Sequence, residues 1–155
     1  MARIPRSELP DGAYHLTARG VDDAPIVVDD LDRLFFVALV RSTVLGLDWI
    51  CHAWCLLTNH FHLVVEAPRL SVSAGMKRIN GLHAQRFNHR HARRGHLFQD
   101  RFAARAIEDD DYLEAVCRYV LANPVRAGLT KRVEDWRWSG LGTPNVAATT
   151  APPRR

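Results

Sequence analysis

The sequence lacks any hydrophobic run long enough to cross a membrane. Its longest apolar stretches, residues 34–40 and 50–57, fall well short of the roughly 20 residues that a bilayer requires. Residues 1–10 carry Arg3 and Arg6 with no apolar segment after them, so a secretory signal is not expected. Cysteine is scarce too. The chain has three cysteines, an odd number, and no two of them form a CxxC pair. These absences predict free thiols, a reducing cytoplasmic location and no membrane partner.

Acidic residues are almost absent from the segment 77–105, although the chain as a whole carries a net charge of only +4. The segment holds one acid, Asp100, and eight basic residues, which are Lys77, Arg78, Arg86, Arg90, Arg93, Arg94, Arg101 and Arg105. Such a patch attracts a polyanion, and Phe98 within it can stack on a base. We therefore predict that these side chains contact nucleic acid. The alternative is a solvated helix face.

The 155 residues, of which 47% are hydrophobic and 25% charged, fit one globular domain. Alternation and turn signals predict strands at 13–19, 48–57, 60–66 and 102–107, and apolar spacing and capping residues predict helices at 31–45, 71–91 and 109–122. This order predicts a ferredoxin-like α+β sandwich, with an antiparallel sheet and helices packed on one face. We expect the domain to cover residues 1–139, and the Thr-, Pro- and Ala-rich residues 140–155 to form a flexible C-terminal tail.

The triplet His60-Phe61-His62 opens a predicted strand. Residues two apart on a strand share a face about 6.5–7 Å apart, so the two imidazoles project side by side and suit one divalent metal. Tyr119 and Asn123 are four residues apart, which puts them on one helical face. The amide oxygen of Asn123 would be a third ligand, with Tyr119 over the same ion as a nucleophile for a phosphate. The alternatives are incidental histidines and a half-buried structural tyrosine.

Three segments together resemble a known family. They are Trp54–Leu57 followed by His60-Phe61-His62, the stretch 95–102 with the sequence GHLFQDRF, and the stretch 118–128 with the sequence RYVLANPVRAG. These segments are similar to the single-tyrosine HUH (IS200-like) transposases, and within them to the REP-associated tyrosine transposases. The resemblance covers about residues 8–139. Thr58 departs from it, since many relatives have proline there.

The resemblance implies a metal-dependent single-stranded DNA endonuclease and strand transferase that uses Mg²⁺ or Mn²⁺ at or beside hairpins. It implies His60, His62 and Asn123 as metal ligands and Tyr119 as the nucleophile that forms a 5′-phosphotyrosine. Hairpin-forming repeats are the implied partner, and a monomer and a homodimer both fit the family. The alternatives are a catalytically inactive module that binds structured single-stranded nucleic acid, and a metal-dependent hydrolase unrelated to nucleic acid. Tyr112, two helical turns before Tyr119, is the rival nucleophile.

Overall fold

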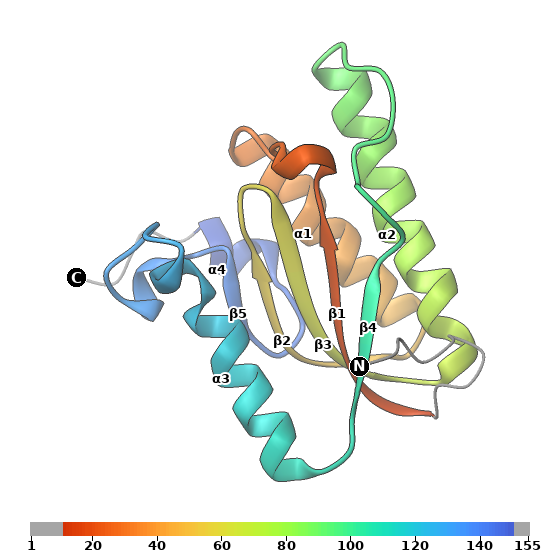
Figure 1. The fold of residues 1–155 in the computed structure, drawn as a ribbon, viewed down its shortest axis with the longest axis vertical. Coiled ribbons are helices and arrows are strands. Elements are labelled where there is room, and N and C mark those ends of the chain that lie inside the picture. Colours follow the sequence, from red (N-terminus) through yellow and green to blue (C-terminus); the bar gives the residue numbers. More distant parts are fainter. Residues whose placement is uncertain (1–10, 151–155) are drawn as a thin grey trace.

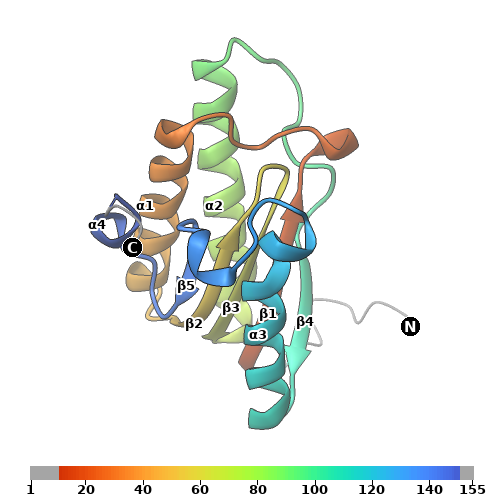
Figure 2. The ribbon, with the colours of Figure 1, turned by 90° about the vertical axis from the view of Figure 1, so that its left-hand side faces the viewer.

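Five strands form one antiparallel sheet in the computed structural model, which describes residues 11–150 (Figures 1 and 2). The elements in chain order are β1 (Gly12–Arg19), η2 (Val21–Asp23), α1 (Asp30–Gly46), β2 (Ile50–Leu56), β3 (His60–Ala67), α2 (Arg69–Arg90), β4 (Ala103–Ile107), α3 (Asp110–Arg126), η3 (Val133–Asp135), β5 (Ser139–Leu141) and α4 (Val146–Thr150). The strand order is β4-β1-β3-β2-β5. This arrangement confirms the predicted ferredoxin-like α+β fold, to which β5 adds an edge strand.

The central strands β1 and β3 separate the two faces of the sheet. In β1, Tyr14, Leu16 and Ala18 are buried, and the residues between them are more exposed. The register pairs Leu16 with Leu63 and Arg19 with His60, and residues directly opposite in an antiparallel pair point to the same face. One face is therefore apolar along both strands, and the other receives the polar side chains.

Helices α1 and α2 cover the apolar face, as Figures 1 and 2 show. Phe36 of α1 and Ile79 of α2 pack there with Leu16 and Phe61 in the main core. The ring centroids of Phe36 and Phe61 lie 4.8 Å apart. Burial of each such side chain contributes about 1.5–3 kcal/mol to the free energy of folding. This core therefore fixes the sheet, whose other face carries the polar side chains.

Helix α3 lies against the opposite face, which differs from the expectation that the helices share one face (Figure 2). Val116 and Val120 of α3 join a second, smaller apolar cluster with Cys55 of β2 and Val64 of β3. The sheet carries apolar residues on both faces in this region, so α3 has a surface of its own to bury. Each face thus has a helical layer, and α3 stands over the polar half of β3.

The end of α3 also differs from the prediction, because Pro124 does not stop the helix. A proline leaves the carbonyl four residues earlier without its helical donor. The side-chain amide of Asn123 donates to that carbonyl, on Val120, at 3.4 Å, and to the carbonyl of Tyr119 at 3.2 Å. The helix runs on to Arg126, and Gly128 with a φ of 73° follows its end.

The expected boundary at residue 139 falls inside the folded region. β5 pairs with β2 at the edge of the sheet, where Gly140 lies opposite Trp54. Pro144 is buried, and its carbonyl accepts a hydrogen bond of 3.0 Å from Arg41 of α1. Residues 140–150 therefore extend the domain, which corrects the tail prediction for them, and residues 151–155 lie outside the described part. Within residues 11–150 no helix is long and apolar enough to cross a membrane.

Candidate functional site

His60 and His62 open β3 on the face that α3 covers. Phe61 between them points to the opposite face and is fully buried in the main core. The two imidazole centroids lie 5.0 Å apart at an interplanar angle of 76°. The predicted side-by-side projection is therefore present, and Phe61 anchors the strand between the two rings.

Each of the two imidazoles is held through its Nδ1 atom. His60 Nδ1 lies 2.7 Å from Asn59 Oδ1, and His62 Nδ1 lies 2.9 Å from His15 Nε2 on β1. The Nε2 atom of His62 is buried and has no hydrogen-bond partner in the described structure. A buried nitrogen without a partner is costly, so this atom is the point at which a ligand would restore a lost interaction.

Burial keeps these histidines uncharged near neutral pH. Desolvation is the main cause that lowers the pKa of His62 to about 3, with further contributions from His15 and His60. Desolvation likewise lowers the pKa of His60 to about 4 and that of His15 to about 4, and Arg105 adds to the shift of His15. A neutral imidazole is the form that binds metals, so the site has the protonation state that a cation requires.

Tyr119 of α3 lies directly over the histidines. Its ring centroid is 6.3 Å from that of His62 and 6.2 Å from that of His15, both edge-on. The tyrosine is 50% exposed, and the guanidinium of Arg126 stacks over its ring at 4.0 Å. Tyr112 lies nearer the start of α3, and no ring contact with a site histidine is found for it within residues 11–150. The geometry therefore favours Tyr119 over Tyr112.

Asn123 stands one helical turn beyond Tyr119 and is partly buried. Its Nδ2 is committed to the carbonyls of Tyr119 and Val120, so Oδ1 is the atom that remains to meet another group. Because the amide bonds to the carbonyls near Pro124, these contacts fix the direction of the Asn123 side chain.

The residues present fit a divalent cation only if Asn123 takes part. Among residues 11–150, no group of three or more His, Cys, Asp and Glu side chains is placed to hold a metal ion. The donors available are Nε2 of His60, the unpartnered Nε2 of His62 and Oδ1 of Asn123. Two neutral nitrogens and one amide oxygen would leave several coordination positions open. Water or phosphate oxygens, the ligands that Mg²⁺ and Mn²⁺ prefer, could fill these positions.

A small hollow of about 230 Å³ adjoins His60. It is bordered by Asn59 in the β2–β3 turn, by Asp23 and by Ala127 and Leu129 beyond the end of α3. The hollow offers space next to the histidines for part of a ligand.

A larger hollow of about 1050 Å³ lies between α2 and residues 95–102. Lys77 and Arg101 border it and are exposed, whereas Phe98 borders it and packs its ring against Phe61. The carbonyl oxygen of the Asn80 side chain is buried there without a partner. The backbone of 97–99 bonds to the segment just after β1, and β1 ends opposite His60. The segment that borders the hollow is thus hydrogen-bonded to the end of β1, whose last residue Arg19 pairs with His60.

The other predicted DNA-contacting cations are spread over several surfaces. Arg86 stacks over Phe35 at 4.4 Å, Arg78 lies 3.4 Å from Ser42 Oγ, and Arg93 donates to the carbonyls of Gly95 and His96. Arg94 is exposed at the loop after α2, and Arg105 on β4 lies opposite His15, on the α3 side of the sheet.

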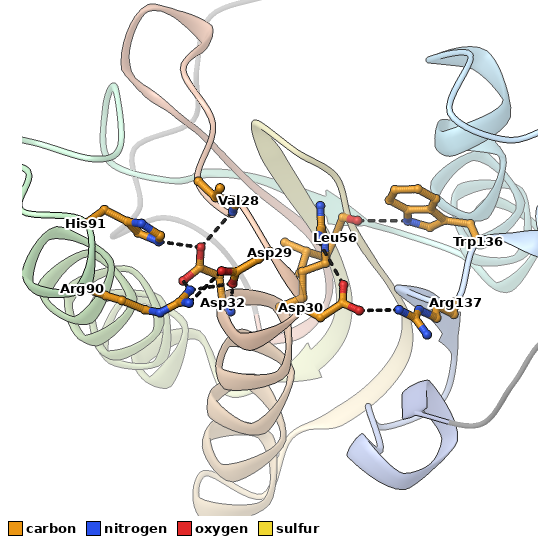
Figure 3. A network of polar contacts seen from close by, with 10 residues as sticks. Val28, Asp29, Asp30, Asp32, Leu56, Arg90, His91, Trp136 and Arg137 are labelled. Atoms are coloured by element: carbon orange, nitrogen blue, oxygen red, sulfur yellow. Dashed lines mark hydrogen bonds and ion pairs between the residues drawn. The ribbon is translucent and has the colours of Figure 1, made fainter.

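Arg90 is engaged in ion pairs with Asp29 and Asp32 (Figure 3). Its guanidinium bonds to Asp29 and, at 2.8 Å, to Asp32, which is 3% exposed. His91 also reaches Asp32, at 2.8 Å. These contacts lower the pKa of the Asp32 carboxyl and tie the end of α2 to the start of α1. The observed contacts of Arg90 are therefore structural.

Two residues of the site were missed by the sequence reasoning. His15 lies within the predicted strand 13–19, and its proximity to His62 depends on the register of β1 against β3. Arg126 follows Tyr119 by seven residues, which is two helical turns, so its place over the ring depends on the helix continuing past Pro124, where the prediction had ended it at residue 122.

The comparisons with known proteins concern the family and the fold of this chain. The family model described as "Transposase IS200 like" matches residues 10–123. No curated protein matches the chain. The fold is similar to that of a REP-associated tyrosine transposase bound to a REP hairpin, with a TM-score of 0.70 and 21% identity over 90% of this chain and 82% of that one. It is also similar to that of a proposed transposase from Deinococcus radiodurans R1, with a TM-score of 0.52 and 16% identity over 79% of this chain and 97% of that one.

Proposed function

Because this chain belongs to the IS200-like transposase family, and is therefore an enzyme that nicks and joins DNA, we propose that it cleaves single-stranded DNA beside hairpins with Tyr119 as the nucleophile. The observation that carries the proposal is the convergence of Tyr119 with His62 and His15, at ring distances of 6.3 and 6.2 Å. Tyr119 and the histidines lie together within one chain, which supports a site formed in cis.

The proposed step is a transesterification at phosphorus. The phenolic oxygen of Tyr119 forms a bond to phosphorus as the bond from phosphorus to the 3′-oxygen breaks. The phenol loses its proton and the departing oxygen gains one, so the products are a 5′-phosphotyrosine and a free 3′-hydroxyl. Attack by another 3′-hydroxyl reverses the step and joins two strands without an external energy source.

Different side chains of the site would serve the attack on phosphorus and the binding of DNA. Arg126 stacks over the ring of Tyr119 and holds the ring in place on α3. His60, His62 and Asn123 would hold Mg²⁺ or Mn²⁺, which, when bound, offsets the charge on the phosphate and on the leaving oxygen. Lys77 and Arg101 would neutralise backbone phosphates beside the larger hollow, where Phe98 offers an aromatic surface to a base.

Adduct formation tests the nucleophile. Hairpin oligonucleotides with randomised single-stranded flanks, labelled at the 3′ end, are incubated with the protein and Mn²⁺ and separated on a denaturing gel. The label remains with the 5′-phosphotyrosine, so a slow band is expected for wild type and for Tyr112→Phe, and no band for Tyr119→Phe. An adduct that survives in Tyr119→Phe and is lost in Tyr112→Phe would move the nucleophile to Tyr112. Tight binding with no adduct in any form would favour the inactive binding module.

A further inference from the structure

His15 lies beside His62 on the neighbouring strand and contacts no other site nitrogen among the hydrogen bonds of residues 11–150. We propose that His15 is a positioning residue, which holds His62 in the tautomer whose Nε2 carries a lone pair and can bind a divalent cation. This inference rests on the proposed function, because it concerns the ion that His60, His62 and Asn123 would hold.

The position of His15 is set by the two central strands of the sheet. His15 pairs with Val64 and Thr17 pairs with His62, so His15 and His62 are diagonal neighbours on one face. Their ring centroids lie 5.1 Å apart and their planes are inclined by only 22°. Both strands are hydrogen-bonded on both sides, which fixes the 2.9 Å contact between the two ring nitrogens.

This contact allows two arrangements of protons between the neutral rings. If His15 Nε2 donates, His62 Nδ1 accepts and the proton of His62 sits on Nε2, which is buried and has no acceptor. If His62 Nδ1 donates, His15 Nε2 accepts and Nε2 of His62 carries a lone pair. The first arrangement leaves a buried donor unsatisfied, and the second leaves on Nε2 a lone pair that a cation can bind.

The neighbouring ligand is arranged in the same way. The partner of His60 Nδ1 is Asn59 Oδ1, which can only accept, so His60 must donate from Nδ1 and keep the lone pair on Nε2. His15 is thus the counterpart of Asn59. Asn59 and His15, the outer partners of the two ligands, thus give both imidazoles the tautomer with the proton on Nδ1. Two Nε2 ligands of a single cation require this tautomer.

The contact is tested by removing the acceptor and by restoring it. His15→Phe keeps a ring beside Tyr119 and removes the nitrogen, and His15→Gln places an amide oxygen near the position of Nε2. His52→Gln is the control, because His52 is a strand histidine whose Nε2 bonds to Glu66, at 2.7 Å, outside the site. Binding of Mn²⁺ alone is measured by electron paramagnetic resonance, and nitrogen-15 spectra of the metal-free protein report which nitrogen of His62 is protonated.

The expected spectrum of wild type has the His62 proton on Nδ1. His15→Phe is expected to weaken Mn²⁺ binding about 10- to 100-fold, the usual cost of losing an outer partner, whereas His15→Gln and His52→Gln stay near wild type. The proposal is overturned if the metal-free wild type carries the His62 proton on Nε2, a result that does not depend on whether the variants fold. Equal Mn²⁺ affinity in wild type and His15→Phe would also overturn it.

The adduct assay separates this inference from the proposed function. Loss of Mn²⁺ affinity in His15→Phe, with no DNA adduct in wild type, would support the positioning role and refute the nuclease. A wild type that forms the adduct but binds Mn²⁺ no better than His15→Phe would retain the nuclease and refute the positioning role. A wild type that binds no Mn²⁺ at all would overturn the positioning role and the proposed metal site together.

Discussion

The metal-free protein is expected to lose stability between pH 7.5 and pH 5.5 because of its buried histidines. His15, His60 and His62 have pKa values of about 4, 4 and 3 in the folded state, below the usual 6.5 of an exposed imidazole. Their contribution to stability is therefore present above pH 6.5. As the pH falls from 6.5 towards 4, these histidines bind protons in the unfolded chain but not in the folded chain, so the free energy of unfolding decreases.

The size of this loss follows from the same values. Between pH 7.5 and pH 5.5 each imidazole costs about 1.3 kcal/mol, and the three together about 4 kcal/mol at most. Urea unfolding followed by tryptophan fluorescence at pH 7.5, 6.5 and 5.5 measures it. His62→Gln should reduce the pH-dependent part of the loss by about 1.3 kcal/mol, and His89→Gln, on the exposed side of α2, should leave it unchanged. A wild type whose stability does not change over this range would refute the reasoning.

Three further predictions concern DNA contact, the network of Figure 3 and the turn after β1. Lys77→Ala combined with Arg101→Ala should reduce the slope of log affinity against log salt by about 1.4 for a single-stranded oligonucleotide, measured by fluorescence anisotropy, and an unchanged slope would remove both from the interface. Arg90→Gln should lower the free energy of unfolding by about 2 kcal/mol, since it strips a buried carboxylate of its main partner, and should barely change the salt slope. Gly20→Ala places a Cβ 2.1 Å from a backbone oxygen and should destabilise the protein, whereas Gly46→Ala meets nothing within 4 Å and should raise stability by roughly 0.5–1 kcal/mol. Thermal unfolding would compare the two.

The sequence allowed prediction of those parts of the site that depend on local periodicity. His60 and His62 share a face because strand residues alternate, and Tyr119 and Asn123 share a face because helix residues recur at four. Both spacings hold whatever the rest of the chain does. The helix and strand positions were predictable to within a few residues for the same reason.

Features that depend on pairing between distant segments were not predictable in this way. His15 meets His62 only because β1 and β3 pair in one register, and a slip of one residue would move it to the other face. Arg90 belongs to a basic run in the sequence, but Asp29 and Asp32, which bind it, lie about 60 residues earlier. The C-terminal segment contains only three residues of strand, and β5 forms because the free edge of β2 accepts it.

The site combines a buried half with an exposed half, and the difference follows from what each must do. His62 is 6% exposed and sits on a central strand, where its tautomer and direction are fixed before any ligand arrives. Tyr119 is 50% exposed on a helix that packs through Val116 and Val120, so its hydroxyl stays open to an incoming strand. A buried nucleophile would exclude DNA, and an exposed histidine pair would be partly protonated near neutral pH and mobile. The fold therefore places the groups that must be rigid in the sheet, and the group that must reach the substrate on the layer above it.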